Sequence, residues 1–426
     1  MARLPGLALG VLTALRARDF RLLWMSQTVS MLGDALVIVA IGLYVTRLTG
    51  QPGDVAFVLA AYALPLVVFV LIGGVVADRL PRQTVMVASD VVRAALHGTL
   101  ALLIGIGVVQ VWHMVVIGAL YGTAEAFFRP AYSGLVPQTL TTDADIQAAQ
   151  ALGGLSAEFA QFASPALATA LVLGVGGAAA FALDAGTFVL SAVLVVRIRS
   201  RARGDKAERQ SMAVELREGW QAVRERPWVV WTVATFSVTV TFAYAPFLVL
   251  GATVAHSRYG TEAVFGWANT AIGAGTVAGA ILASRWSPAY PMRVGILAAI
   301  SWPASLVLFA AAVPLALLYP LLAVAGAGVG VFAVFWETAL AQRVPPHLLS
   351  RVSAWDWMGS LAFIPVGYLI AGALARAVGA VEVVVIGSVI GSLSLAVGAI
   401  PAATRMLERI EAPAITASAD RVPIAE

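Results

Sequence analysis

The sequence contains no cysteine, and only 12% of its 426 residues are charged. The absence of cysteine excludes disulfide bonds, thiolate metal sites and cysteine nucleophiles. Only four histidines are present, at positions 97, 113, 256 and 347, and such scattered residues do not indicate a histidine metal cluster. We therefore predict neither a metal site nor any other cofactor.

Charge is scarce because the chain is strongly apolar, with 60% hydrophobic residues and a mean hydropathy of +0.89. Soluble domains carry about 25% charged residues. A soluble fold of this length could not bury so much apolar surface, so we predict that lipid is the solvent. Soluble enzymes and nucleic-acid-binding proteins are thereby excluded. The net charge of +4 does not change this conclusion, because the basic residues lie mainly in short loops between apolar segments.

Apolar runs of about 20 residues, the length that crosses roughly 30 Å of hydrocarbon, recur along the whole chain. They predict an all-α integral membrane protein with twelve transmembrane helices. The predicted spans are residues 22–45, 55–76, 84–106, 111–128, 147–172, 178–196, 228–250, 263–284, 292–312, 315–336, 352–375 and 381–402.

The distribution of lysine and arginine predicts the orientation, because positive residues are retained on the cytoplasmic side. With both termini in the cytoplasm, 23 of the 27 basic residues lie in cytoplasmic segments, only Arg47, Arg258 and Arg376 lie outside, and Arg93 lies within a helix. We therefore expect a multi-pass protein of the cytoplasmic (inner) membrane with both termini inside. The predicted divisions are residues 1–196 for the N-terminal bundle, 197–227 for a central cytoplasmic loop, 228–402 for the C-terminal bundle and 403–426 for a cytoplasmic tail.

The central loop has a helical pattern of its own. Leu216, Trp220 and Val223 repeat at helical spacing among glutamates and arginines, which predicts a short amphipathic helix on the inner membrane surface. A plain solvated linker is the alternative.

The two halves of the chain match each other at an offset of about 206 to 208 residues. Residues 73–79 (GGVVADR) align with residues 279–285 (GAILASR), and residues 122–137 align with residues 330–345. Apolar helices align readily with one another, but the shared charged and proline positions favour a true duplication. Two six-helix bundles related by a parallel internal repeat are typical of transporters whose substrate path runs between the halves.

The loop between the second and third spans carries a recognisable motif. It reads Gly74-Val-Val-Ala-Asp78-Arg79-Leu-Pro81-Arg82-Gln83 and resembles the cytoplasmic signature of the major facilitator superfamily. Pro81 and Gln83 depart from that signature, where a second glycine and a cation are usual. The resemblance implies a cytoplasmic gate whose carboxylate accepts charge-assisted bonds from a neighbouring helix. Its predicted members are Gly74, Asp78, Arg79 and Arg82, with Glu337 and Asp356 as further latches near the cytoplasmic ends of their spans.

Longer stretches resemble one branch of that superfamily, which holds macrolide-efflux proteins and siderophore exporters. They are the opening FRLLWMSQTVSMLGDALVIVAIGLYVTRLTG, the segment EAFFRPAYSGLVPQTL and the late QRVPPHLLSRVSA with IPVGYLIAGALA. The resemblance implies export of drugs or metabolites. The fifth span departs from many drug antiporters, because Ser164-Pro165 lacks the flanking glycines of their proline motif.

Ionisable residues inside a membrane need a partner or a task, because each costs at least about 2.5 kcal/mol to insert. Spacings of three and four residues predict two intramembrane ion pairs, Asp90 with Arg93 and Glu125 with Arg129, for which plain structural neutralisation is the simplest role. Three acids lack an opposite charge at helical spacing and are our proton-coupling candidates. They are Asp34, Glu158 and Asp184. Burial favours the protonated form of a carboxyl group, so such a residue can exchange a proton for substrate.

Polar stripes on apolar helices predict the substrate cavity. Gln27, Ser30 and Asp34 share one face of the first span, and Glu158 and Gln161 share one face of the fifth. In the second half, Thr235, Thr239 and Phe242 follow the same spacing, and several aromatic residues gather in later spans. Such a cavity suits an amphipathic substrate, although aromatic residues near helix ends also form interfacial belts.

We therefore predict a secondary active transporter, and not an enzyme, that exports an amphipathic drug or natural product by proton-coupled alternating access. ATP drive is excluded because the only lysine, Lys206, belongs to no phosphate-binding loop, and no hydrolase or metalloprotease motif occurs. The alternative is an uptake symporter or facilitator of a small polar solute. The expected partners are a small-molecule substrate, the proton and the lipid bilayer, with no nucleic acid, and the expected state is a monomer.

Overall fold

A computed structural model describes residues 13–140, 142–199 and 212–408 of the chain. All regular elements within these ranges are helical. The first half contains η1 Thr13–Arg16, α2 Arg18–Thr49, α3 Pro52–Arg79, α4 Arg82–Gly105, α5 Val111–Leu135, η2 Val136–Gln138, α6 Asp143–Gly174 and α7 Gly177–Val196. After α8 Met212–Arg224, the second half contains α9 Pro227–Thr239, η3 Val240–Tyr244, α10 Ala245–Tyr259, α11 Ala263–Arg285, α12 Pro291–Ala299, α13 Ser301–Ala310, α14 Leu315–Arg343, α15 Pro346–Leu361, α16 Ile364–Val378, α17 Ala380–Gly398 and α18 Ala402–Arg405.

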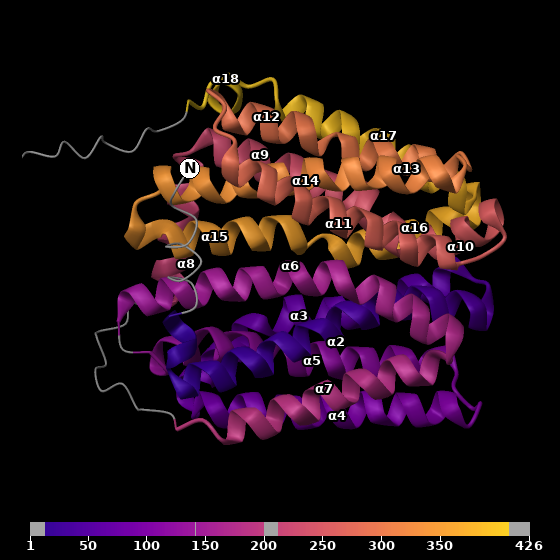
Figure 1. Cartoon of the computed structure of the whole chain (residues 1–426), viewed down its shortest axis with the longest axis horizontal. Coiled ribbons are helices and arrows are strands. Elements are labelled where there is room, and N and C mark those ends of the chain that lie inside the picture. The colour runs from indigo at the N-terminus through magenta and orange to yellow at the C-terminus, as the bar shows by residue number, and fades with distance from the viewer. Residues whose placement is uncertain (1–12, 141, 200–211, 409–426) are drawn as a thin grey trace, which may run out of the picture.

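The long helices lie side by side as an elongated bundle (Figure 1). Within the described residues, eleven helical segments are long and apolar enough to cross a membrane. The 32-residue α6 runs among them and makes the twelfth crossing. Every predicted span overlaps one of these crossings, so the all-α, twelve-helix fold class is confirmed. Most helices extend beyond the predicted limits, because their polar ends continue past the apolar stretch that the pattern detects.

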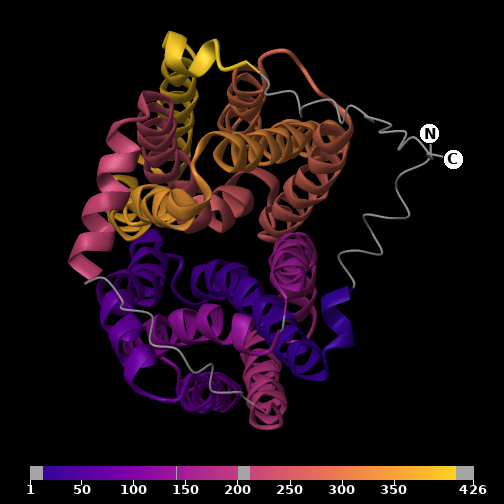
Figure 2. The ribbon, with the colours of Figure 1, turned by 90° about the vertical axis from the view of Figure 1, so that its left-hand side faces the viewer.

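The two halves use the same helix pairings. In the first half α3 packs on α5 and α4 packs on α7, and in the second half α11 packs on α14 and α13 packs on α17. Glycines allow close contact at equivalent crossings: a Cβ atom on Gly122 of α5 would lie 2.1 Å from a backbone oxygen of α3, and one on Gly330 of α14 would lie 2.0 Å from a backbone oxygen of α11. Seen from one end, the halves form two bundles (Figure 2). This layout agrees with the predicted parallel repeat.

Three crossings of the second half are interrupted, and each interruption precedes a proline. The π-helical turn η3 comes before Pro246, α12 and α13 part at Ile300 before Pro303, and α15 and α16 part at residues 362–363 before Pro365. Proline lacks the N–H that continues the ladder, and its ring clashes with the carbonyl four residues earlier. The second half therefore lines the centre of the molecule with irregular helices, and the sequence analysis did not anticipate this.

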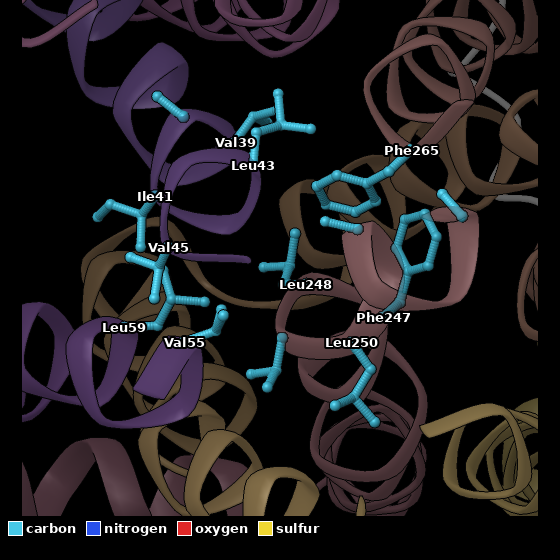
Figure 3. Close-up of a cluster of buried hydrophobic side chains, with 14 of the residues drawn as sticks. Val39, Ile41, Leu43, Val45, Val55, Leu59, Phe247, Leu248, Leu250 and Phe265 are labelled. Carbon is cyan, nitrogen blue, oxygen red and sulfur yellow. The ribbon is translucent and has the colours of Figure 1, made fainter. Parts of the chain in front are cut away.

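The halves are packed together at one end of the bundle. We call this the Gly50 end, after the turn between α2 and α3, and the opposite end, where α3 is followed by α4, the Arg79 end. At the Gly50 end one apolar cluster joins Val39 and Leu43 of α2 to Phe247 and Leu248 of α10 and Phe265 of α11 (Figure 3). Van der Waals packing across this shared surface holds the halves together there, because apolar helix surfaces gain no hydrophobic driving force in lipid.

The Arg79 end has three separate apolar clusters. One contains only residues of the first half, such as Phe20 and Phe128, and the other two contain only residues of α8 and the second half, such as Trp228 and Phe335. The described halves thus share a core at the Gly50 end and keep their own cores at the Arg79 end.

The central loop contains a helix, α8, where its helical pattern predicts one. In α8, Val223 is buried in the cluster of the second half, and the ring of Trp220 lies 5.0 Å from that of Trp355 on α15. Glu218 forms an ion pair with Arg351. The side chain of Leu216 lies outside the described residues. The helix is therefore attached to α15, and its contact with a membrane surface stays a prediction.

Candidate functional site

A cavity of about 290 Å³ lies between the two halves, midway along their helices. The first half contributes α2 and α6, and the second half contributes residues from α9, η3 and six later helices. The lining residues are Ala35, Ile38, Val39, Glu158, Gln161, Pro165, Phe236, Thr239, Val240, Tyr244, Phe247, Leu248, Asn269, Ile272, Gly273, Thr276, Ala299, Trp302, Val329 and Leu395.

The wall from the second half is mainly apolar and aromatic. Two of its polar groups are engaged with their own helix, α11: the amide of Asn269 donates to Phe265 O at 2.9 Å, and the hydroxyl of Thr276 donates to Ile272 O at 3.0 Å. Among the described residues that line the cavity, Glu158 is the only acidic or basic one, and its side chain is exposed. One carboxyl group thus faces an aromatic wall, an arrangement that suits an amphipathic ligand with a positive charge.

The predicted cavity residues are placed in two different regions. Glu158, Gln161 and Thr239 line the central cavity, and their contact with a substrate stays a prediction. Thr235 is instead buried against Gly398 of α17, with its hydroxyl donating to Trp231 O at 2.9 Å. Thr235 is therefore not among the residues that line this cavity, because equal helical spacing does not reveal which neighbour a face meets.

Phe242, Gln27 and Ser30 are also absent from the described lining. The carbonyl of Phe242 lies against Gly387 of α17. Ser30 is buried, and both its hydroxyl and the amide oxygen of Gln27 lack a hydrogen-bond partner among the described residues. These two residues lie nearer the Arg79 end of α2 than the segment that meets the cavity.

Asp34 lies in a second, smaller cavity of about 140 Å³ between α2, α3, α5 and α16. Ile38 lines both cavities. The Asp34 carboxylate accepts a hydrogen bond from the hydroxyl of Tyr121 and lies 3.8 Å from a guanidinium nitrogen of Arg93. The tertiary fold therefore supplies the positive partner that the spacing along α2 does not show.

Arg93 is the centre of a buried ionic cluster. Its side chain is 1% exposed and donates to Asp90 at 2.6 Å, and Asp90 in turn accepts a bond of 2.6 Å from Ser191 on α7. The guanidinium also lies over the rings of Phe128 and Phe188, at 4.3 and 4.2 Å from their centroids. The structure thus brings Asp90 and Arg93 together as their spacing suggests and adds an aromatic enclosure.

Glu125 and Arg129 also lie together, at 2.6 Å, on the face of α5 that borders the Asp34 cavity. Asp184 is fully buried on α7, where its carboxylate contacts Nδ1 of His97. The other ring nitrogen of His97, Nε2, is 3.1 Å from the hydroxyl of Tyr62. Glu158 lies apart from the other two proton-coupling candidates, whereas Asp34 and Asp184 are neighbours connected through Tyr121 and His97.

Sequence reasoning missed His97, Tyr62, Tyr121 and Ser191 as members of this polar core. A usable signal was present for two of them. Asp90, Arg93 and His97 follow one another at steps of three and four along α4, and Tyr121 precedes Glu125 by four residues on α5. Such stripes identify a helix face that turns away from lipid.

The predicted gate residues lie at the Arg79 end. The side chain of Asp78 lies outside the described residues, Gly74 is half-buried and Arg79 is exposed. Arg82 donates to the carbonyl of Gly134 within its own half. The amide of Gln83 donates to Val195 O at 2.8 Å and Ile198 O at 3.0 Å at the end of α7, so this departure from the signature connects two helices of the first half.

Glu337 is exposed on α14. Asp356 on α15 accepts a bond of 2.9 Å from the indole of Trp336. Both residues lie in the half of the molecule opposite to the signature loop, and neither meets it in the described arrangement.

No group of three or more histidine, aspartate or glutamate side chains in the described residues is arranged to hold a metal ion. Twelve membrane crossings, paired alike in two halves around a central cavity, define a multi-pass membrane transporter. The chain belongs to the Major Facilitator Superfamily, whose family model matches residues 23–360.

Several curated proteins are similar in sequence. The multidrug efflux pump Tap of Mycolicibacterium fortuitum is 28% identical over 82% of this chain and 87% of Tap. The uncharacterized MFS-type transporter YfiS of Bacillus subtilis is 29% identical, but this match spans only 50% of the chain and 51% of YfiS. Macrolide efflux protein A of Streptococcus pyogenes is 26% identical over 48% of the chain and 51% of that protein.

Solved structures share the fold at low sequence identity. A bacterial homologue of the human lysosomal transporter Spinster, in an inward-facing and unoccupied conformation, has a TM-score of 0.69 and 13% identity, with 93% of this chain and 99% of the other covered. The nucleoside transporter NupG has a TM-score of 0.66 and 14% identity, with 90% and 99% covered. At these identities the likeness concerns the fold alone.

Proposed function

We propose that this transporter exports an amphipathic, positively charged drug or natural product across the cytoplasmic membrane in exchange for protons. The observation that carries the proposal is the single carboxyl group, Glu158, facing the aromatic wall of the central cavity. Phe236, Tyr244, Phe247 and Trp302 supply apolar contact area and cation–π surface, and Glu158 supplies the opposite charge. A small polar solute would find few free hydrogen-bonding groups there, so uptake of such a solute is not favoured.

The separate cores at the Arg79 end support a state that opens towards that end. Most basic loop residues lie at the same end, which places it in the cytoplasm under the positive-inside rule. Substrate then enters from the cytoplasm or the inner leaflet, and the bundles rock about the cavity to release it outside. The gate residues Asp78, Arg79 and Arg82 would hold the opposite, outward-open state. Both halves and the gate residues belong to one chain, so a monomer is sufficient for transport.

Proton coupling is assigned first to Asp34. Its carboxylate lies in a cavity that shares the lining residue Ile38 with the central one. Helix α2 borders both cavities, so protonation of Asp34 changes the charge on a helix that lines the central cavity. Entry of one proton down the membrane potential is worth about 2.3 kcal/mol per 100 mV, which offsets the cost of moving one positive charge of the substrate outward, so a one-for-one exchange is driven by the pH gradient. The names of Tap and macrolide efflux protein A, an efflux pump and an efflux protein, agree with the direction of transport.

The test measures loss of preloaded ethidium, a lipophilic cation, and of Nile red, a neutral lipophile, from energised cells. Wild type should expel ethidium until a proton ionophore is added. Glu158→Gln should weaken ethidium export at least about tenfold, because a charge-assisted contact is worth about 1.5 to 3 kcal/mol, while Nile red export persists. Asp34→Asn should stop the active export of both dyes.

The matched control is Asp54→Asn, at the start of α3 and away from both cavities. It should behave as wild type. Equal loss of both dyes in Glu158→Gln would contradict the role of its charge in substrate choice. Ethidium export that resists the ionophore would refute proton coupling, and accumulation instead of loss would establish uptake.

A further inference from the structure

His97 and Asp184 form a fully buried pair that the transport proposal above leaves unused. His97 lies on α4 and Asp184 on α7, both side chains are 0% exposed, and Nδ1 of the imidazole contacts the Asp184 carboxylate. The second carboxylate oxygen accepts a bond of 3.3 Å from Thr187. It lies over Gly33 of α2, where a Cβ atom would be 1.8 Å away. The glycine next to Asp34 is therefore what leaves room for this carboxylate.

The imidazole is also connected to the Asp34 cavity. Its Nε2 lies 3.1 Å from the hydroxyl of Tyr62, and Tyr62 lines that cavity together with Asp34. Its ring stacks on Tyr121 at 4.4 Å with an interplanar angle of 5°, and the hydroxyl of Tyr121 donates to Asp34. The hydroxyl group of Tyr62 thus lies between His97 and the cavity, while Tyr121 contacts both His97 and Asp34.

The charges around this pair do not balance without added protons. The groups that face it or its neighbours are Asp34 on α2, Asp90 and Arg93 on α4, Glu125 and Arg129 on α5, and Asp184 on α7. Four carboxyl groups against two guanidinium groups leave two negative charges in a poorly solvated core. Uncompensated buried charge is strongly unfavourable, so the core has capacity for two protons. Asp34 takes one of them, and the pair of His97 and Asp184 is the remaining fully enclosed site.

We propose that His97 and Asp184 form a second proton-binding site of the first half, filled and emptied through the hydroxyl of Tyr62 from the cavity that Asp34 lines. In the filling step the Tyr62 O–H transfers its proton to Nε2 of His97, and the phenolic oxygen regains one from a hydronium ion in the cavity, which leaves neutral water. The neutral imidazole becomes an imidazolium, whose Nδ1–H remains bonded to the Asp184 carboxylate. The reverse sequence empties the site.

This proposal rests on the proposed proton-coupled function, but proton binding can be measured without transport. The experiment records ¹⁵N spectra of the four histidines in purified, ¹⁵N-histidine-labelled protein in lipid nanodiscs between pH 5 and pH 9. The His97 signals are those lost in His97→Gln. The matched control is His113→Gln, because His113 is a half-buried first-turn residue of α5 that caps Gln110, packs on Trp112 and lines neither described cavity.

The expected result is a change of His97 between neutral and doubly protonated imidazole within this pH range. In Asp34→Asn its midpoint should move by at least about half a pH unit, because one negative charge fewer faces the stacked Tyr121 and the imidazole. The His113 midpoint should stay in place. A His97 imidazole that keeps one protonation state throughout, or one whose midpoint ignores Asp34, would overturn the proposal and leave a purely structural hydrogen bond.

A second variant guards against misfolding. Tyr62→Phe keeps the ring that packs against Gly118 and removes only the hydroxyl. We expect the His97 resonance to report loss of the Nε2 hydrogen bond, and we expect protonation of His97 to become slow.

In proteoliposomes, the number of protons moved per ethidium should fall from two to one in Asp184→Asn. Histidine titration without any ethidium–proton exchange would refute the proposed function and leave the second site intact. Ethidium–proton exchange with a His97 that does not change protonation would refute the second proton site and leave the proposed function intact.

Discussion

At the scale of single residues, the first half holds its buried charges by mutual contact, and the described part of the second half contains no comparable buried ionic cluster. Arg93 serves two carboxylates, Asp90 at 2.6 Å and Asp34 at 3.8 Å. The bond to Asp90 is the shorter and more deeply buried, and Ser191 completes it. The longer contact leaves Asp34 partly exposed to its cavity, with 28% of its side chain accessible. The same guanidinium can therefore stabilise the fold through one acid and respond to protonation of the other.

This division of roles predicts the stability of Arg93 variants. Arg93→Leu should lower the free energy of unfolding by about 3 to 5 kcal/mol, because it leaves the buried Asp90 carboxylate unpaired. The double variant Asp90→Asn with Arg93→Leu should recover most of the loss, since no unpaired buried charge remains at that position. Thermal unfolding of the purified protein in detergent provides the measurement. A double variant as unstable as the sum of both single variants would show that the pair does not act as a unit.

At the scale of helices, glycine and proline have opposite effects. Glycines at the crossings of α3 with α5 and of α11 with α14 let backbones approach until a Cβ atom no longer fits, which is how membrane helices gain contact without a hydrophobic driving force. Prolines interrupt three crossings of the second half and leave those of the first half continuous. The regular half carries the ionic core, and the irregular half carries the apolar wall.

Two glycines in the first half allow this packing argument to be tested. Gly122→Ala should destabilise the protein by about 1 to 3 kcal/mol, because the new Cβ would lie 2.1 Å from the backbone oxygen of Tyr62. Gly98→Ala on α4 is the matched control, since open space surrounds that position and alanine is the better helix former. Melting temperatures in detergent should fall for the first variant and stay equal or rise for the second. Equal effects of both would refute close backbone packing at Gly122.

At the scale of the whole molecule, the Gly50 end is closed and the Arg79 end has separate cores. The closed end is also bridged by charge: Arg47 of α2 lies 3.6 Å from Glu262, the residue before α11, and Glu262 accepts from His256 at 3.0 Å. The contact of Arg47 with Glu262 crosses between the halves and must break when the protein opens to the other side, whereas that of His256 with Glu262 lies within the second half. The apolar cluster shared by the two halves at the Gly50 end must separate as well.

Because the chain has no cysteine, spin labels can be attached at chosen positions without removing native thiols. One pair, Leu80→Cys with Gln342→Cys, spans the halves at the Arg79 end, and the control pair, Leu48→Cys with Arg258→Cys, spans them at the Gly50 end. All four positions are exposed. With ethidium and a change of pH, electron–electron distances should shorten for the first pair and lengthen for the second, because rigid halves rock about the central cavity. Distances that change at one end only would contradict rigid-body alternation.

Much of the architecture follows from the sequence without coordinates. The number and order of the membrane crossings depend on the length of apolar runs, and the repeat is visible in aligned glycines, charges and prolines. The family follows from the loop of Gly74 to Gln83 and is confirmed by the match to residues 23–360. Glu158, Gln161 and Thr239 were placed in the central cavity because polar side chains on an apolar helix must face away from lipid.

The partner of each polar face was decided by the tertiary structure. Periodicity fixes the direction of a side chain relative to its own helix, but not which of several neighbouring helices it meets. Asp34 and Asp184 had no counter-charge along their own helices, and folding supplied Arg93 and His97 from α4. Thr235 shared a stripe with Thr239, yet only Thr239 reaches the cavity. The chain encodes these contacts only through the packing of all twelve crossings, because buried charges are satisfied by whichever groups the bundle brings within reach.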